Sequence, residues 1–108
     1  MTSETIAMSW SAVESVNASM HRAADESHWL DVLDLATKRH TMLQAHFDRF
    51  PIGPDNAEFY RRHMDLMLQG ETKLRDAVRN ARKALMSEGI DTQRKQRALG
   101  AYLNVAMR

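Results

Sequence analysis

The segment HWLDVLDLATKRHTMLQAHF, residues 28–47, decides the fold class. Its apolar residues recur every three or four positions, which is the spacing of one face of an α-helix. Extended to residue 50, the stripe consists of Trp29, Leu33, Ala36, His40, Leu43, Phe47 and Phe50. Further apolar residues widen it, and a wide stripe is typical of a helix that packs against more than one neighbour. We therefore expect a helix over residues 28–50 inside an antiparallel bundle.

Segments on both sides have the same periodicity, and turn-forming residues separate them. The sequence ADES interrupts the apolar pattern and ends a helix over residues 3–24. PIGP ends the helix over 28–50, because proline and glycine do not continue a helix. Asp55 and Glu58 resemble a capping box that opens a helix over 55–88. A shorter helix follows over 92–107. The sequence thus predicts one all-α domain, residues 1–108, in which three long antiparallel helices form a bundle with a shorter fourth helix that we expect to be mobile.

The fourth helix is the weakest of the four. Arg94, Lys95 and Arg97 lie in its first turns, where positive charge opposes the helix dipole. Gly100 in its interior costs about 1 kcal/mol relative to alanine, and a helix of this length alone in water is marginal. We expect it to form only while its apolar side is docked on the third helix. That side consists of Leu99, Tyr102, Leu103 and Ala106, and the third helix offers Leu74, Val78 and Leu85.

Composition excludes several classes of protein. The chain has no cysteine, which excludes disulfides and thiolate metal sites. It contains no apolar run of the ~20 residues that a membrane-spanning helix needs. The first residues lack the basic start and continuous apolar block of a signal peptide. We therefore expect a cytoplasmic protein without membrane insertion.

The net charge of +1 conceals an asymmetry between two parts of the chain. Residues 1–72 carry six Lys/Arg and eleven Asp/Glu, whereas residues 73–108 carry nine Lys/Arg and three Asp/Glu. A basic C-terminal third can attract an acidic partner or nucleic acid. No helix-turn-helix or zinc pattern accompanies it. We interpret the basic stretch as a solvated face and expect no direct nucleic-acid binding.

Patterns typical of catalysis or metal binding are missing from the sequence. No two of the five histidines are four residues apart and Glu-x-x-His is absent, so neither a zinc pair on one helix nor a carboxylate di-metal bundle is predicted. No nucleophile elbow or phosphate loop occurs. We expect no catalytic residue, metal or cofactor. We also expect His40 and His63 to meet the helix seam, and Arg39, Arg61 and Arg62 to face solvent.

Methionine is abundant, with eight residues in the chain, two of them in the middle of the third helix. Methionine adapts to irregular partners and is common on promiscuous binding surfaces. The apolar surface of the third helix is also wider than a bundle of three such helices needs. The fourth helix, a second copy or a partner helix must therefore cover it. The predicted partner-binding residues are Met64, Met67, Leu68, Leu74, Val78 and Leu85.

Two segments resemble the FliT-type flagellar export chaperones. Residues 27–47 are similar to the second helix of that family, in which a tryptophan opens a helix with leucines and a central arginine. The matching residues are Trp29, Leu30, Leu33, Leu35, Arg39 and Leu43. Residues 92–105 are similar to the last helix of the family through Arg94, Lys95, Arg97, Ala101 and Tyr102. The order of four helices, with a long third and a short fourth, also agrees.

The resemblance implies a cytoplasmic, non-enzymatic chaperone of flagellar type III export. Such proteins bind the C-terminal region of the filament-cap protein, prevent its premature assembly and deliver it to the export apparatus. Some members also bind the flagellar master transcription regulator. In the family the last helix covers the partner surface until it is displaced, so the resemblance implies that the fourth helix is an autoinhibitory latch.

Two other hypotheses remain open. In the first, the surplus apolar surface makes a homodimer, and the chain is a helical interaction module without an export role. In the second, the chain is a small helical enzyme with an arginine-lined pocket. That enzyme would need a buried cluster of three or more arginines and a carboxylate.

Overall fold

The computed structural model describes the backbone of residues 5–88 and 93–106, and the side chains of residues 5–84 and 95–105. Four α-helices are present: α1 (Ile6–Asp25), α2 (Trp29–Arg49), α3 (Ala57–Glu88) and α4 (Gln93–Ala106). The described part of the chain has no strand, so the all-α class is confirmed. Observed and predicted helix ends differ by at most two residues wherever both are described, and the predicted ends at residues 3, 92 and 107 lie outside the described residues.

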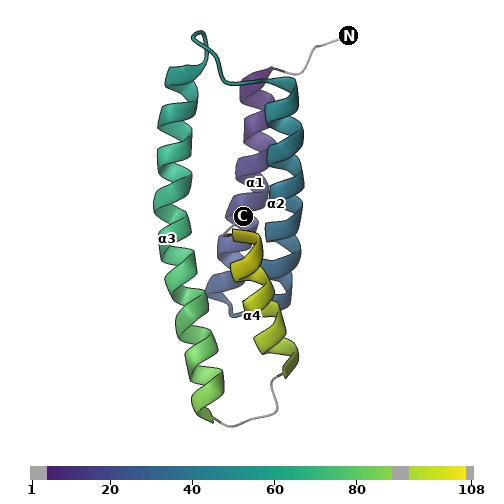
Figure 1. The fold of residues 1–108 in the computed structure, drawn as a ribbon, viewed down its shortest axis with the longest axis vertical. Coiled ribbons are helices and arrows are strands. Elements are labelled where there is room, and N and C mark those ends of the chain that lie inside the picture. Colours follow the sequence, from purple (N-terminus) through teal and green to yellow (C-terminus); the bar gives the residue numbers. More distant parts are fainter. Residues whose placement is uncertain (1–4, 89–92, 107–108) are drawn as a thin grey trace.

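The helices form an elongated molecule of 54 × 26 × 22 Å (Figure 1). Helices α1 and α2 lie side by side and share the most extensive contact, followed by α2 and α4. Helix α3 stands apart, and within the described residues no Cα atom of α3 comes within 8 Å of one in α2. Helix α4 runs back along the lower half of the bundle between α2 and α3 (Figure 1). Large side chains or another helix must therefore fill the space between α2 and α3.

The turn between α1 and α2 explains how these helices become neighbours. Ser27 has a φ of 58°, the left-handed conformation that commonly ends a helix. The backbone N–H groups of Ser27 and His28 donate to the carbonyls of Ala24 and Ala23, at 3.0 and 2.9 Å. These two bonds satisfy the last carbonyls of α1 and reverse the chain within three residues.

Two separate groups of side chains fill the bundle. The α4 core, in the lower half, consists of Met20, Ala23, Trp29, Val32, Ala36, Leu74, Val78, Leu99 and Tyr102. The aromatic cluster, in the upper half, surrounds Trp10, whose ring lies 5.2–6.5 Å from the rings of His46, Phe47, Phe59, Tyr60 and His63. All four helices contribute to the α4 core, whereas α1, α2 and α3 build the aromatic cluster.

The buried face of α2 is rotated relative to the predicted stripe. Its buried residues are Trp29, Val32, Ala36, Arg39 and His46. The stripe residues Leu33, His40, Leu43, Phe47 and Phe50 are half-buried. The rotation has a polar cause: Arg39 and His46 both find hydrogen-bond partners on α1 and α3, which offset the cost of removing them from water.

Candidate partner-binding groove

Helix α4 lies in an apolar groove between α2 and α3. Leu99 and Tyr102 are each 1% exposed, and Ala98 is buried beside them. The groove is lined by Trp29, Val32 and Ala36 from α2, Leu74 and Val78 from α3, and Met20 from α1. Small and branched residues line most of this surface, so a whole helix fits where a single side chain would not fill the space. Helix α4 is therefore an integral part of the lower core.

The predicted latch residues take different places in this groove. Leu99 and Tyr102 are buried, and Leu103 is half-buried against the same core. The side chains of Ala106 and Leu85 lie outside the described residues. Docking near Leu74 and Val78 is as expected, but α4 has a more extensive contact with α2 than with α3. The prediction of docking on α3 alone was incomplete because the α2 wall depends on tertiary packing. Mobility of α4 stays a prediction.

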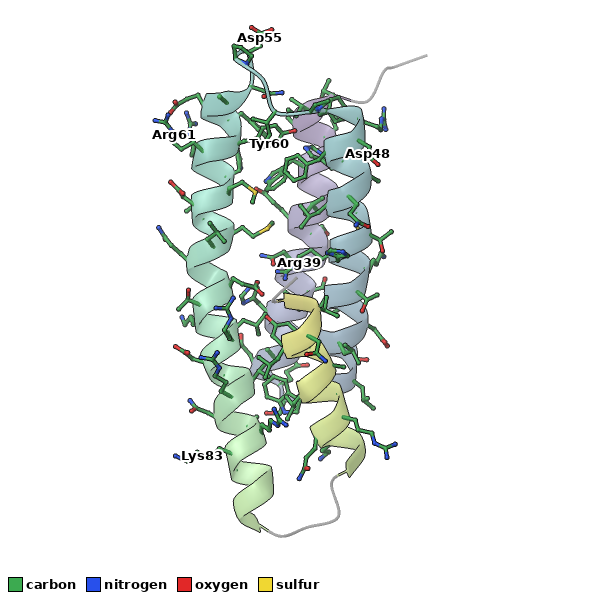
Figure 2. The ribbon with its side chains drawn as sticks, in the orientation of Figure 1. Arg39, Asp48, Asp55, Tyr60, Arg61 and Lys83 are labelled. Carbon is green, nitrogen blue, oxygen red and sulfur yellow. The ribbon has the colours of Figure 1, made fainter. Side chains whose placement is uncertain are left out.

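A buried polar network crosses the bundle at the upper end of the α4 core. Arg39 donates from Nη1 to Glu71 Oε2 at 2.8 Å and from Nη2 to Glu71 Oε1 at 3.2 Å. The same Nη1 donates to Asn17 Oδ1 at 2.7 Å. The hydroxyl of Tyr102 donates to Glu71 Oε1 at 2.8 Å. The network thus joins α1, α2, α3 and α4, and Arg39 lies at mid-height in the bundle (Figure 2).

The expectation that Arg39 faces solvent was wrong. It is 7% exposed, and Glu71 is 8% exposed. A buried guanidinium is tolerated when a carboxylate pairs with it in bidentate geometry. Its partner lies 32 residues away in the sequence, so no local pattern reveals the pair. Arg61 and Arg62 are exposed, as expected.

The electrostatics of the network keep its members in complementary states. Burial alone would raise the pKa of Glu71, but hydrogen bonds and charge from Arg39, with the Tyr102 hydroxyl, outweigh it and hold the pKa below its usual value. Burial, followed by the hydrogen bond and charge of Glu71, raises the pKa of Tyr102 well above its ordinary value. At neutral pH the carboxylate is therefore ionised and the phenol is protonated, as the hydrogen bond between them requires.

Above this network, where no described Cα atom of α2 lies within 8 Å of one in α3, we infer that the groove continues beyond the described end of α4. Two polar contacts set the register of α2 against α3: Arg39 with Glu71, and His46 Nε2 with the Tyr60 hydroxyl at 2.7 Å. Between these contacts along each helix lie Leu43 on α2 and Met64 and Met67 on α3. Ala106, the last described residue of α4, lies about one turn beyond Tyr102. Helix α4 therefore ends near the lower edge of this section.

The uncovered section, which we call the open groove, has apolar walls. Leu43 and Phe47 from α2 and Met64 and Met67 from α3 are half-buried, although buried residues of the same helix faces flank them. Leu68 is 58% exposed and lies four residues after Met64, on the same side of α3. On the α2 side a surface hollow of about 560 Å³ is lined by His40, Leu43, Gln44, Phe47 and Asp48. Of the predicted partner-binding residues, three thus lie at the open groove, and Leu74 and Val78 lie under α4.

His46, which is 2% exposed, belongs to the aromatic cluster at the upper end of the bundle. Tyr60 projects from α3 toward α1 and α2 (Figure 2) and its hydroxyl donates to the carbonyl of Phe50 at 2.8 Å. Because that bond uses the phenolic hydrogen, His46 Nε2 donates to the Tyr60 oxygen. Nδ1 lies 2.8 Å from Ser9 Oγ. Burial also raises the pKa of Tyr60, so its hydroxyl stays protonated as a donor.

From the sequence we expected His40 and His63 at the helix seam, whereas His46 is the buried histidine in the structure. The expectation for His40 was wrong, because the rotation of α2 moves it to the edge, where it lines the surface hollow. His63 does reach the aromatic cluster, half-buried, with Nδ1 3.0 Å from Glu14 Oε1 and its ring 4.2 Å from that of Phe59. His46 was missed because its partners Ser9 and Tyr60 belong to other helices.

Other chemistry receives little support from the described residues. No three His, Asp or Glu side chains among them are arranged to hold a metal ion. Of the arginines whose side chains are described, Arg39 is the buried one, and Glu71 neutralises it. The arginine-lined enzyme would need three or more. In the described helices, no stretch combines the length and hydropathy needed to cross a bilayer.

Comparison with known proteins identifies no relative. No protein-family model, no curated protein and no solved structure matches the chain. The resemblance to the FliT-type chaperones thus rests on the residues of the second and fourth helices and on the order and lengths of the four helices.

Proposed function

We propose that this chain is a FliT-type export chaperone that holds a client helix in the groove between α2 and α3. The observation that carries the proposal is the open groove. The groove walls are mostly apolar, with Glu71 as a charged exception, and α4 covers the lower part. Leu43, Met64 and Met67 are half-buried and Leu68 is exposed. An amphipathic helix that presents apolar residues at i, i+3 or i+4 and i+7 fits such a surface.

The chemistry of the walls suits a client that folds against them. Two of the three α3 residues at the open groove are methionines, whose flexible thioether side chains adapt to different partner shapes. Leucine and phenylalanine on α2 supply a more rigid opposite wall. By the resemblance, the client is the C-terminal region of the flagellar filament-cap protein, which the chaperone keeps unassembled until export.

Helix α4 acts in this proposal as the latch. A client that needs the lower groove must displace α4, whereas a client confined to the open groove binds beside its end. The support for displacement is the poor intrinsic helix stability of α4, with Arg94, Lys95 and Arg97 at its start and Gly100 in its interior. The burial of Leu99 and Tyr102 acts in the opposite direction, so only a client that replaces these contacts can open the latch.

Further assignments follow from the same resemblance and remain part of the proposal. They are a cytoplasmic location, the absence of enzymatic activity and of a cofactor, delivery of the client to the export apparatus, and binding of the flagellar master transcription regulator. None of them requires direct contact with nucleic acid or insertion into a membrane.

Calorimetric titration of the full-length chain with the C-terminal region of a filament-cap protein tests the proposal. We expect one-to-one binding, weakened about tenfold by Met64→Ala combined with Met67→Ala, because truncating apolar anchors usually produces losses of this size. Leu66→Ala is the matched control, since Leu66 is 62% exposed and lies on a different side of α3.

Two outcomes would reject the export role. One is the absence of binding to the cap-protein region by a correctly folded chain. The other is a stable dimer in dilute sedimentation runs that ignores this region and dissociates when Met64 and Met67 are truncated. The second result would favour the homodimeric interaction module.

A further inference from the structure

The carboxylate of Glu71 lies in the wall of the groove that α4 occupies, and its two oxygens are unequally satisfied. Oε2 accepts a 2.8 Å bond from Arg39 Nη1, whereas Oε1 accepts a longer 3.2 Å bond from Arg39 Nη2. The short bond to Oε1 comes from the hydroxyl of Tyr102, at 2.8 Å. Arg39 neutralises the charge of Glu71, but α4 completes its hydrogen bonding.

Removing α4 has different consequences for the apolar and polar parts of this surface. With the groove empty, water reaches Oε1 and replaces the lost hydroxyl. A purely apolar helix that then covers the groove would expel this water and leave Oε1 with the 3.2 Å bond. A buried acceptor that loses its partner carries a large desolvation penalty, and a carboxylate carries more than a neutral group. The wall therefore disfavours occupants that lack a donor at this level.

We propose that Glu71 selects the helix that replaces α4, which must carry a leucine-sized residue and, three positions later, a neutral hydrogen-bond donor. Leu99 and Tyr102 have this spacing in α4 itself. Leu99 lies among the apolar side chains of the α4 core while Tyr102 reaches the carboxylate. This inference rests on the proposed function, since it concerns the partner helix that takes the place of α4.

The donor is neutral because the charges of the site are already balanced. Arg39 and Glu71 form a buried ion pair, and the positive charge of Arg75 also acts on the Tyr102 hydroxyl. A lysine at the position of Tyr102 would add an uncompensated cation in a low-dielectric environment, which is costly. Tyrosine, serine, threonine, asparagine or glutamine can donate without this penalty.

The test uses the full-length Leu99→Ala chain, in which α4 has lost its main apolar anchor, as the receptor. The probes are labelled synthetic peptides with the sequence of residues 93–106, either native or carrying Tyr102→Phe or Tyr102→Lys. Fluorescence anisotropy measures their binding. We expect the native peptide to bind about tenfold more tightly than either variant. On a receptor that also carries Arg39→Met and Glu71→Met, the preference for the native peptide over the phenylalanine peptide should disappear.

The outcomes separate this inference from the proposed function. Equal binding of the native and phenylalanine peptides to the Leu99→Ala receptor would overturn the selection by Glu71 and leave helix exchange intact. Failure of every peptide to bind a folded receptor would overturn helix exchange and the selection by Glu71 together, whereas the calorimetric titration with the cap-protein region decides the proposed function separately. A measurement without any peptide adds an independent check: Tyr102→Phe in the full-length chain should speed hydrogen exchange of the α4 amides about tenfold. Unchanged exchange would contradict the inference.

Discussion

The two ends of the bundle fill the distance between α2 and α3 in different ways. At the upper end, the rings of Trp10, His46 and Tyr60 reach across directly, so three helices are enough. At the lower end the facing residues include Ala36, Leu74 and Val78, and a fourth helix fills the remaining space. The upper end is therefore filled by side chains of α1, α2 and α3, whereas the lower end also requires α4, which we propose is exchangeable.

Under the proposed function, the upper end of the bundle supplies stability and the lower end binds the partner. The aromatic cluster joins α1, α2 and α3 without a side chain from α4, so we expect it to hold these three helices together when α4 detaches. Its rings are also tied by hydrogen bonds from Trp10 to Glu14 and from Tyr60 to Phe50. We therefore expect the three-helix framework to persist when α4 leaves its core. Between the two ends lies the open groove, where Leu43, Met64 and Met67 are half-buried and Leu68 is exposed among the described residues.

The largest effect is expected in the aromatic cluster. Trp10→Ala removes a side chain that is 1% exposed and contacts five other rings, so it should lower the free energy of unfolding by about 3–5 kcal/mol. Urea denaturation followed by circular dichroism measures the change. Met8→Ala, at a 57% exposed position of the same helix, should change stability by less than about 0.5 kcal/mol. A small loss for Trp10→Ala would show that the upper end does not hold the framework.

A smaller global effect is expected in the α4 core. Leu99→Ala truncates a leucine that is as deeply buried as Trp10. If α4 detaches on its own, however, the loss in free energy of unfolding cannot exceed the docking free energy of α4. We expect a loss of about 2 kcal/mol, at the low end for a buried leucine. Asn104→Ala, at an exposed position of α4, is the control. A loss as large as that of Trp10→Ala would erase the distinction between the two ends.

Acidification should weaken the lower end of the bundle in two stages. Burial is the main cause that lowers the pKa of His21 from 6.5, so the unfolded state takes up a proton first and stability falls as the pH drops through 6.5. The pKa of Glu71 is also lowered, from 4.5, so a second loss begins as the pH falls below 4.5. Urea titrations between pH 8 and 3 measure both stages.

The same titrations provide the control for that prediction. The variant with both Arg39→Met and Glu71→Met removes the buried pair together, so it leaves no unpaired charge and should lose the second stage. If the free energy of unfolding of the wild-type chain rose between pH 7 and pH 3 on acidification, the predicted direction would be contradicted.

The smallest effect concerns the interior of α4. Gly100→Ala should stabilise docked α4 by about 1 kcal/mol, since a Cβ at this position meets nothing within 4 Å. Thermal denaturation measures the gain. The same variant also tests the latch hypothesis. A client that displaces α4 should bind the Gly100→Ala chain about fivefold more weakly than the wild-type chain. Unchanged client affinity would show that the client uses the open groove alone.

Much of the fold was predictable because local rules determine it. The 3.6-residue periodicity identified all four helices, and the PIGP segment with Asp55 located the longest turn. The surplus of apolar residues on α3 was also visible, and Met64, Met67 and Leu68 are indeed incompletely covered.

The polar core and the second wall of the groove were not predictable from local patterns. Arg39 and His46 are buried because Glu71 and Ser9, 32 and 37 residues away, offer them hydrogen bonds. Those partners also rotate α2, which moves Phe47 to the edge of the open groove. That α4 packs chiefly on α2 depends on the separation of α2 and α3, a tertiary property with no sequence signature.

Native-state hydrogen exchange of the full-length chain tests the central claim most directly. The account predicts that amides of α4 near Leu99 and Tyr102 exchange through a local opening, with a free energy well below that of amides near Trp10 and His46. The framework amides should exchange at the free energy of global unfolding. If the α4 amides also exchanged only through global unfolding, the lower end would not be an exchangeable site, and the account would be contradicted.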